Sequence, residues 1–109
     1  MPITKVGKIS LKNSGGFVAK MQLAYINDDG EKVYTGKSGD VTLGFTKEVD
    51  PGDMGVPTGS NIYLKAIVVA GFDKEANKMF VYEKGNTTVA KFMISGTTLS
   101  NDMGFLGTE

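Results

Sequence analysis

The chain has 109 residues, of which 40% are hydrophobic and 22% are charged, so it is the size of one domain and can form a core. Cysteine, histidine and tryptophan are absent, and all 12 basic residues are lysines. This composition excludes disulfides, thiolate or imidazole metal sites and the usual general base of enzymes. The net charge of zero gives no electrostatic footprint for nucleic acid. We therefore expect a non-enzyme without a metal or other cofactor.

The N-terminus carries no recognisable targeting segment. Met1–Lys5 lacks the apolar run of about 7–15 residues that a signal peptide needs. The longest apolar stretch, Ala66–Ala70, is too short to span a bilayer. We expect a soluble protein made in the cytosol without a conventional signal peptide; action at a target-cell surface would require release by another route.

Alternating apolar and polar residues predict strands throughout the first half of the chain. These predicted strands lie at residues 6–12, 17–26, 32–35 and 41–46. Turn sequences rich in Gly, Asn, Asp and Ser separate the first three strands and follow the third, at residues 13–16, 27–30 and 36–39. The run Asn27-Asp28-Asp29-Gly30 is typical of a hairpin, because Gly30 can adopt a positive φ.

The second half begins with a Pro- and Gly-rich loop over residues 50–60, followed by the most hydrophobic strand, at 61–71. The continuous run Ile67-Val68-Val69 predicts burial on both sides of that strand. Polar residues 72–78 fit a loop or one helical turn. Two further strands are expected at 79–84 and 88–95, and the tail at 100–109 fits either a last short strand or a loose end.

These elements predict an all-β fold. The alternation is that of strands, turn sequences recur at regular intervals, and no internal repeat or linker divides the chain. About seven to eight antiparallel strands in one domain over residues 1–109 are typical of an antiparallel β-sandwich.

Polar motifs give weak signals for chemistry. The acidic residues lie in groups beside predicted turns, at Asp28–Glu31, Asp50–Asp53 and Asp73–Glu75, where Asp usually bonds its own backbone. No phosphate-binding glycine motif is present. The glycosylation sequon at Asn86-Thr87-Thr88 is expected to be inert without a secretory signal.

Apolar residues beside predicted turns are more informative. These residues are Leu43, Phe45, Phe72, Leu99, Met103 and Phe105. Single exposed apolar side chains are ordinary. If several of them converge at one end of the sandwich, however, they form an apolar tip of the kind that marks a partner or membrane site.

A family resemblance rests on several segments in the same order. Residues 8–25, KISLKNSGGFVAKMQLAY, resemble the opening of the C-terminal domain of the cholesterol-dependent, thiol-activated cytolysins. The resemblance continues through Asp29-Gly30-Glu31, Thr42–Thr46, the strand NIYLKA at Asn61–Ala66 and the closing MISGTTL at Met93–Leu99. It covers about residues 6–101. The Trp-rich undecapeptide of the family is replaced by Val68–Lys78, and 109 residues accommodate only this module.

The resemblance implies a β-sandwich with a tip built from four loops, which in that family touches cholesterol-containing membranes or a glycosylated receptor. Thr98-Leu99 match the family's sterol-recognition pair. The membrane- or receptor-binding residues implied by the apolar pattern and the resemblance together are Gly15, Gly16, Leu43, Phe45, Phe72, Thr98 and Leu99.

The leading hypothesis is therefore a membrane- or receptor-binding module, such as a small toxin or toxin component. The expected partners are membrane lipid, sterol included, or a cell-surface glycan or receptor, and no nucleic acid. Two alternatives stay open. A lectin-like module would use the aromatic rings of Tyr34, Tyr63 and Tyr82, and a self-associating structural protein would form a homo-oligomer through a sheet edge or the tip.

Overall fold

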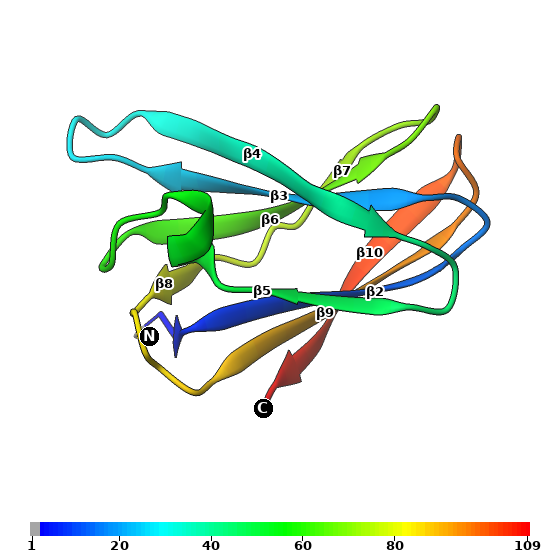
Figure 1. Cartoon of the computed structure of the whole chain (residues 1–109). Coiled ribbons are helices and arrows are strands. Elements are labelled where there is room, and N and C mark those ends of the chain that lie inside the picture. The colour runs from blue at the N-terminus through cyan, green and yellow to red at the C-terminus, as the bar shows by residue number, and fades with distance from the viewer. Residues whose placement is uncertain (1–2) are drawn as a thin grey trace.

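The computed structural model describes residues 3–109, which form two packed sheets and one short 3-10 helix (Figure 1). The elements in chain order are β1 (Lys5–Val6), β2 (Lys8–Gly15), β3 (Ala19–Ile26), β4 (Lys32–Val41), β5 (Thr46–Val49), η1 (Pro51–Met54), β6 (Asn61–Val68), β7 (Lys74–Glu75), β8 (Phe80–Tyr82), β9 (Val89–Gly96) and β10 (Asn101–Thr108). The predicted all-β sandwich is confirmed.

The strands divide into a six-stranded and a four-stranded sheet. The first has the order β1-β8-β6-β3-β4, with β7 pairing β6, and the second has the order β10-β9-β2-β5. The pairs β2–β9 and β1–β8 are parallel, so both sheets are mixed rather than antiparallel as the sequence predicted. The ten strands include two of only two residues.

The core lies between the inner faces of the two sheets. Strands β6 and β9 alternate strictly between buried and half-buried residues over most of their length, because successive side chains of a strand point to opposite faces. The largest fully buried side chains include Tyr82, Phe80 and Phe92. The rings of Phe80 and Phe92 meet edge to face, with centroids 6.1 Å apart, a favoured aromatic geometry.

The strand β6 ends earlier than expected. It stops at Val68, Ile67 is only half-buried on the outer face and Val69 is exposed. The prediction of burial on both sides was therefore wrong. The chain turns immediately, with Ala70 at φ +59°, a conformation that is uncommon for a residue other than glycine.

The glycines at 36 and 39 do not break the third predicted strand, because β4 runs through them. The register against β3 shifts on both sides of Gln22, which marks bulges. Side-chain hydroxyls replace the missing backbone acceptors: Met21 N–H donates to Ser38 Oγ at 2.8 Å and Leu23 N–H to Thr35 Oγ1 at 3.0 Å. The bulged strand therefore stays attached to the sheet.

Residues 42–45 form a turn rather than part of a strand. Gly44 adopts φ +86°, and the turn carries the chain from the edge of one sheet, β4, to the edge of the other, β5. At the opposite end of the chain, the tail forms the eight-residue strand β10, antiparallel to β9.

Candidate functional site

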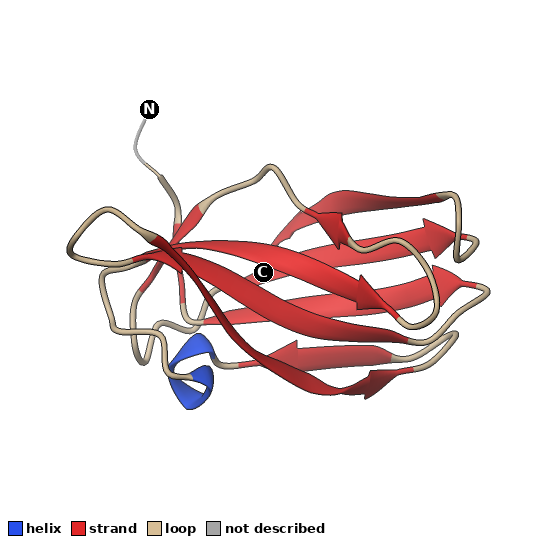
Figure 2. Cartoon of the chain, turned by 90° about the horizontal axis from the view of Figure 1, so that it is seen from above, coloured by secondary structure: helices blue, strands red, loops and turns tan. Residues whose placement is uncertain are grey.

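Four loops lie together at one end of the sandwich, the right-hand end in Figures 1 and 2. We call this end the tip and define it as residues 16–18, 42–45, 69–73 and 97–100, which connect β2–β3, β4–β5, β6–β7 and β9–β10. Backbone hydrogen bonds join three of these loops: Val69 N–H donates to Val18 O, and Phe72 N–H donates to Thr98 O. In addition, Gly16 N–H donates to the carbonyl of Gly96, the last residue of β9. Residues far apart in the sequence thus form one surface.

The tip carries exposed apolar side chains from three of its four loops. Their exposed fractions are 61% for Leu43, 67% for Phe45, 44% for Val69, 64% for Phe72 and 67% for Leu99. Of the six apolar residues that the sequence singled out beside turns, Leu43, Phe45, Phe72 and Leu99 reach solvent at this end. The other two, Met103 and Phe105, lie within β10 and not in the tip loops. Val69 belongs with the first four and was missed, because it was read as part of a buried strand.

The remaining predicted site residues contribute through the backbone. Gly15 is buried, and a Cβ atom there would lie 2.2 Å from the ring of Phe17, so this glycine makes room for the ring. Gly16 is exposed and has open space around it. Thr98 is half-buried, and its carbonyl accepts a hydrogen bond from Phe72 N–H at 2.9 Å.

A buried asparagine, Asn13, holds loops 16–18 and 42–45 in place. Its amide Nδ2 donates to Phe17 O at 2.6 Å and to Val41 O at 2.9 Å, while Oδ1 accepts from Gly15 N–H at 2.8 Å. Its backbone N–H donates to Phe45 O. Asn13 is fully buried, and so are the three hydrogen bonds of its side chain, so their loss would be costly. From the sequence, this residue was indistinguishable from an ordinary turn asparagine.

A second asparagine, Asn101, holds the other two loops. Its Nδ2 donates to Phe72 O at 2.9 Å, next to the bond between Phe72 N–H and Thr98 O. Gly71 lies so close to this loop that a Cβ atom there would stand 2.3 Å from Thr98 O. The backbones of loops 69–73 and 97–100 are therefore in direct contact, and Phe72 and Leu99 are presented from one unit.

Charge is distributed unevenly between the two ends. The tip contains one charged residue, Asp73, and its Oδ1 accepts a hydrogen bond from Val68 N–H at 3.0 Å. The opposite end carries the acidic hairpin at 27–31, the acidic residues of the 50–60 loop and Glu83-Lys84. Because desolvating a charge is expensive, the tip is the end that can leave water at least cost.

The tyrosines of the lectin-like alternative do not form one platform. Tyr82 is buried, and its hydroxyl donates to Asp50 Oδ1 at 2.6 Å. Burial and this hydrogen bond raise the pKa of Tyr82 to about 12. Tyr34 and Tyr63 lie on the outer face of the larger sheet, where Lys32 Nζ lies 5.5 Å and 5.3 Å from their ring centroids. Tyr82 is therefore excluded as a sugar-stacking residue.

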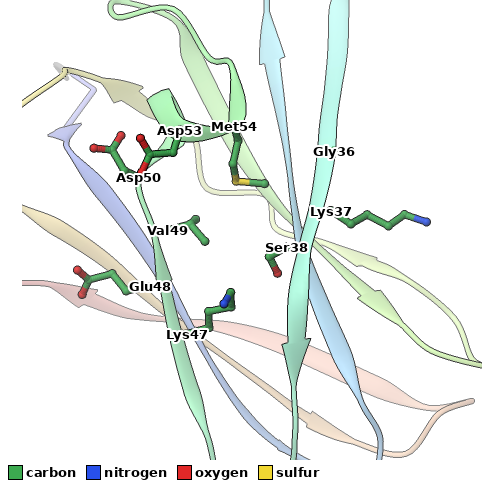
Figure 3. Close-up of a pocket in the computed structure, with 9 residues that line it drawn as sticks. All are labelled: Gly36, Lys37, Ser38, Lys47, Glu48, Val49, Asp50, Asp53 and Met54. Carbon is green, nitrogen blue, oxygen red and sulfur yellow. The ribbon is translucent and has the colours of Figure 1, made fainter.

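A groove of about 470 Å³ lies on one side of the sandwich, between the edge strands β4 and β5 and the helix η1 (Figure 3). Ser38 and Val49 point into it, whereas Lys37 points away. Asp50 is the N-cap of η1 and accepts from Gly52 N–H at 2.9 Å. Its carboxylate is thus committed to the helix and to Tyr82.

Two negative findings concern the part of the chain between residues 3 and 109. No helix there is long and apolar enough to cross a membrane. Within the same residues, no group of three or more acidic side chains is arranged to hold a metal ion.

Comparison with known proteins establishes the fold. No family model and no curated protein sequence matches the chain. A solved structure described as a Gram-negative toxin matches with 21% identity and a TM-score of 0.52, covering 92% of this chain and 22% of that one. The membrane-binding domain of pneumolysin matches with 16% identity and a TM-score of 0.46, covering 93% of this chain and 96% of that domain.

This chain thus spans about a fifth of the length of the full toxin. The structural likeness extends the resemblance seen in the sequence. The chain has the fold of a domain that occurs in larger toxins, the β-sandwich implied by its resemblance to the C-terminal domain of the cholesterol-dependent cytolysins.

Proposed function

We propose that this protein is a non-enzymatic docking module that inserts its tip shallowly into a membrane surface. One observation carries the proposal: exposed apolar side chains from separate loops converge on the tip, whose four loops contain one charged residue. Exposed apolar clusters of this kind mark interaction sites. The resemblance of residues 8–25 and 93–99 to the cytolysin domain supports a membrane as the partner.

The exposed area is sufficient for reversible binding. Phe45 exposes 67% of its surface, so inserting its ring would remove about 130 Å² from water and contribute about 3 kcal/mol. Five such side chains act together, against the loss of translational and rotational freedom on association. The free energy gained by inserting these side chains exceeds the cost of association, but by little enough that binding stays reversible.

Flotation of the protein with vesicles tests the proposal. We use phosphatidylcholine vesicles with and without cholesterol, and a third set containing anionic lipid. The wild-type chain is expected to float with neutral vesicles, and added anionic lipid is expected to change binding little, because the tip offers no basic residue. If binding requires cholesterol, Thr98-Leu99 would act in sterol recognition, as the resemblance implies.

Truncation of one ring gives the quantitative arm of the test. Phe45→Ala is expected to weaken binding by about 30- to 140-fold, from about 2–3 kcal/mol of lost insertion. Ile3→Ala, at an exposed apolar residue outside the tip loops, is the matched control and should bind as wild type. If Phe45→Ala and Leu99→Ala both float like the wild type, the tip is not the docking surface. Binding to cells without binding to any vesicle would assign the tip to a receptor instead.

A further inference from the structure

The four outer edges of the two sheets differ in how they are protected. An unpaired strand edge invites pairing with another chain, and proteins commonly block it with short strands, charges or bulges. Edge strand β1 has two residues. Edge strand β5 has four, of which Lys47 and Glu48 are charged. Edge strand β4 is bulged and bears Lys32, Lys37 and Asp40.

The fourth edge, β10, lacks most of this protection. It is eight residues long with the sequence NDMGFLGT, in which Asp102 is the one charged residue. Asn101–Phe105 stay in unbroken register with β9, and a single bulge follows before Gly107. Among residues 3–109, no strand pairs with the outer edge of β10.

The side of the molecule next to β10 is also open. Loop 69–73 reaches Asn101 through the bond to Phe72 O. Beyond that point, a groove of about 340 Å³ separates β10 from residues 74–78, and Met103, Phe105 and Phe92 form its apolar part. Leu106 is exposed on the same strand. The same groove is lined by charged residues as well, and Lys78 Nζ lies 5.5 Å from the centroid of the Phe105 ring. The edge therefore combines free backbone groups with an exposed apolar side chain, Leu106.

We propose that β10 is an interface between two copies of this chain, which pair through their β10 strands in antiparallel orientation. A strand paired with itself in this way forms a closed two-fold contact, so one surface serves both partners. Centred near Gly104, the pairing places the two Asp102 residues four positions apart, about 14 Å along the strand. Parallel pairing in register would instead bring these carboxylates side by side.

The direction of β10 determines the shape of this dimer. The strand begins at loop 97–100 of the tip and runs away from it (Figure 1). Antiparallel pairing therefore places the two tips at opposite ends of the pair. If the tips dock on membranes, which rests on the function proposed above, one dimer connects two membrane surfaces.

Sedimentation velocity from about 1 µM to about 1 mM tests the pairing, because an interface below roughly 1,200 Å² is expected to be weak. Gly104→Lys places a charge on the edge, and a Cβ atom at Gly104 has open space around it. Gly36→Lys makes the same change on β4, where a Cβ atom is equally unobstructed. Thermal melting checks that both variants fold.

The wild-type chain and Gly36→Lys are expected to shift from monomer to dimer over this range, while Gly104→Lys stays monomeric. A wild-type chain that is monomeric throughout, or equal loss of the dimer in both variants, would overturn the proposal. Light scattering of neutral vesicles then separates the two ideas. Wild type should cluster the vesicles, and Gly104→Lys should float with them without clustering. A dimer that binds no vesicle refutes tip docking and leaves the β10 interface standing; vesicle binding by a dimer without clustering overturns the two-ended arrangement.

Discussion

Asn13→Asp replaces an amide by a carboxylate of almost identical shape beneath the tip. The new side chain can still accept from Gly15 N–H, but it loses the donor that bonds Phe17 O and Val41 O. Two buried carbonyls would then face an oxygen instead of an N–H. Each unsatisfied buried group costs about 1–3 kcal/mol, and placing an unpaired charge in the core adds to this cost. We expect a loss of about 3–5 kcal/mol at neutral pH.

The same substitution predicts a pH dependence whose sign can be worked out. Burial against two carbonyls favours the neutral form, so the pKa of the introduced carboxyl is raised in the folded state. Stability is then best below the unfolded pKa of about 3.9 and falls as the pH rises towards the folded pKa. Below that range, the protonated acid donates to one of the two carbonyls and part of the loss is recovered.

Urea unfolding of Asn13→Asp at pH 7 and at pH 4 measures both effects. Thermal unfolding at pH 7 gives a second measure: for a loss of at least about 3 kcal/mol, the melting temperature should drop by at least about 12 °C. Asn27→Asp is the matched control, because the side chain of Asn27 acts as an acceptor for Asp29 N–H and Glu31 N–H, bonds that a carboxylate keeps. Equal stability of the two variants at pH 7 would refute the role given to Asn13.

Two further predictions concern the tip contact and the buried tyrosine. Gly71→Ala forces a Cβ atom towards Thr98 O, so it should destabilise the fold by about 1–3 kcal/mol and weaken vesicle flotation. Gly16→Ala, on an open part of the tip, should do neither. Equal behaviour of the two variants would contradict the packing of these loops. The raised pKa of Tyr82, about 12, means that the folded state holds this proton more tightly than the unfolded state, so its stabilisation is complete below about pH 10 and is lost as the pH rises towards 12. The free energy of unfolding in urea should therefore fall less between pH 9 and pH 11 for Tyr82→Phe than for the wild type. Tyr63→Phe is the control and should fall as the wild type does. A fall of the same size in Tyr82→Phe would contradict the role given to the buried Tyr82 hydroxyl.

Strand positions and the core were predictable because alternation depends on neighbouring residues alone. In β2, β3, β6 and β9 the apolar positions two apart are those found in the core. Strand pairing depends instead on residues distant in sequence. The parallel pairing of β2 with β9 could therefore not be predicted from the residues of either strand.

The apolar run Ile67-Val68-Val69 shows why the end of β6 was misread. A strand covered on both faces and a strand that leads into an exposed apolar loop both appear in the sequence as a continuous run of apolar residues. Only the turn at Ala70 and the position of the loop at the tip distinguish them. The error hid Val69, one of the five exposed apolar residues of the tip.

The candidate site was predictable in its apolar residues and not in its supports. Leu43, Phe45, Phe72 and Leu99 stood out because each is a large apolar residue beside a turn. The two asparagines that hold their loops could not be distinguished from the asparagines of solvent-exposed turns, because burial is what gives Asn13 and Asn101 their role. That burial depends on packing against segments distant in the sequence, which local sequence patterns do not reveal.

The parallel pairing of β2 with β9 has a consequence for synthesis. During translation, β2 emerges from the ribosome some eighty positions before its parallel partner β9. Contacts between segments so far apart in the sequence form late. Gly16 N–H likewise bonds a carbonyl, that of Gly96, some eighty positions further along the chain. A nascent chain that has emerged only as far as β8 therefore carries Leu43, Phe45 and Phe72, but it still lacks loop 97–100, against which loop 69–73 packs. The tip accordingly assembles late in synthesis.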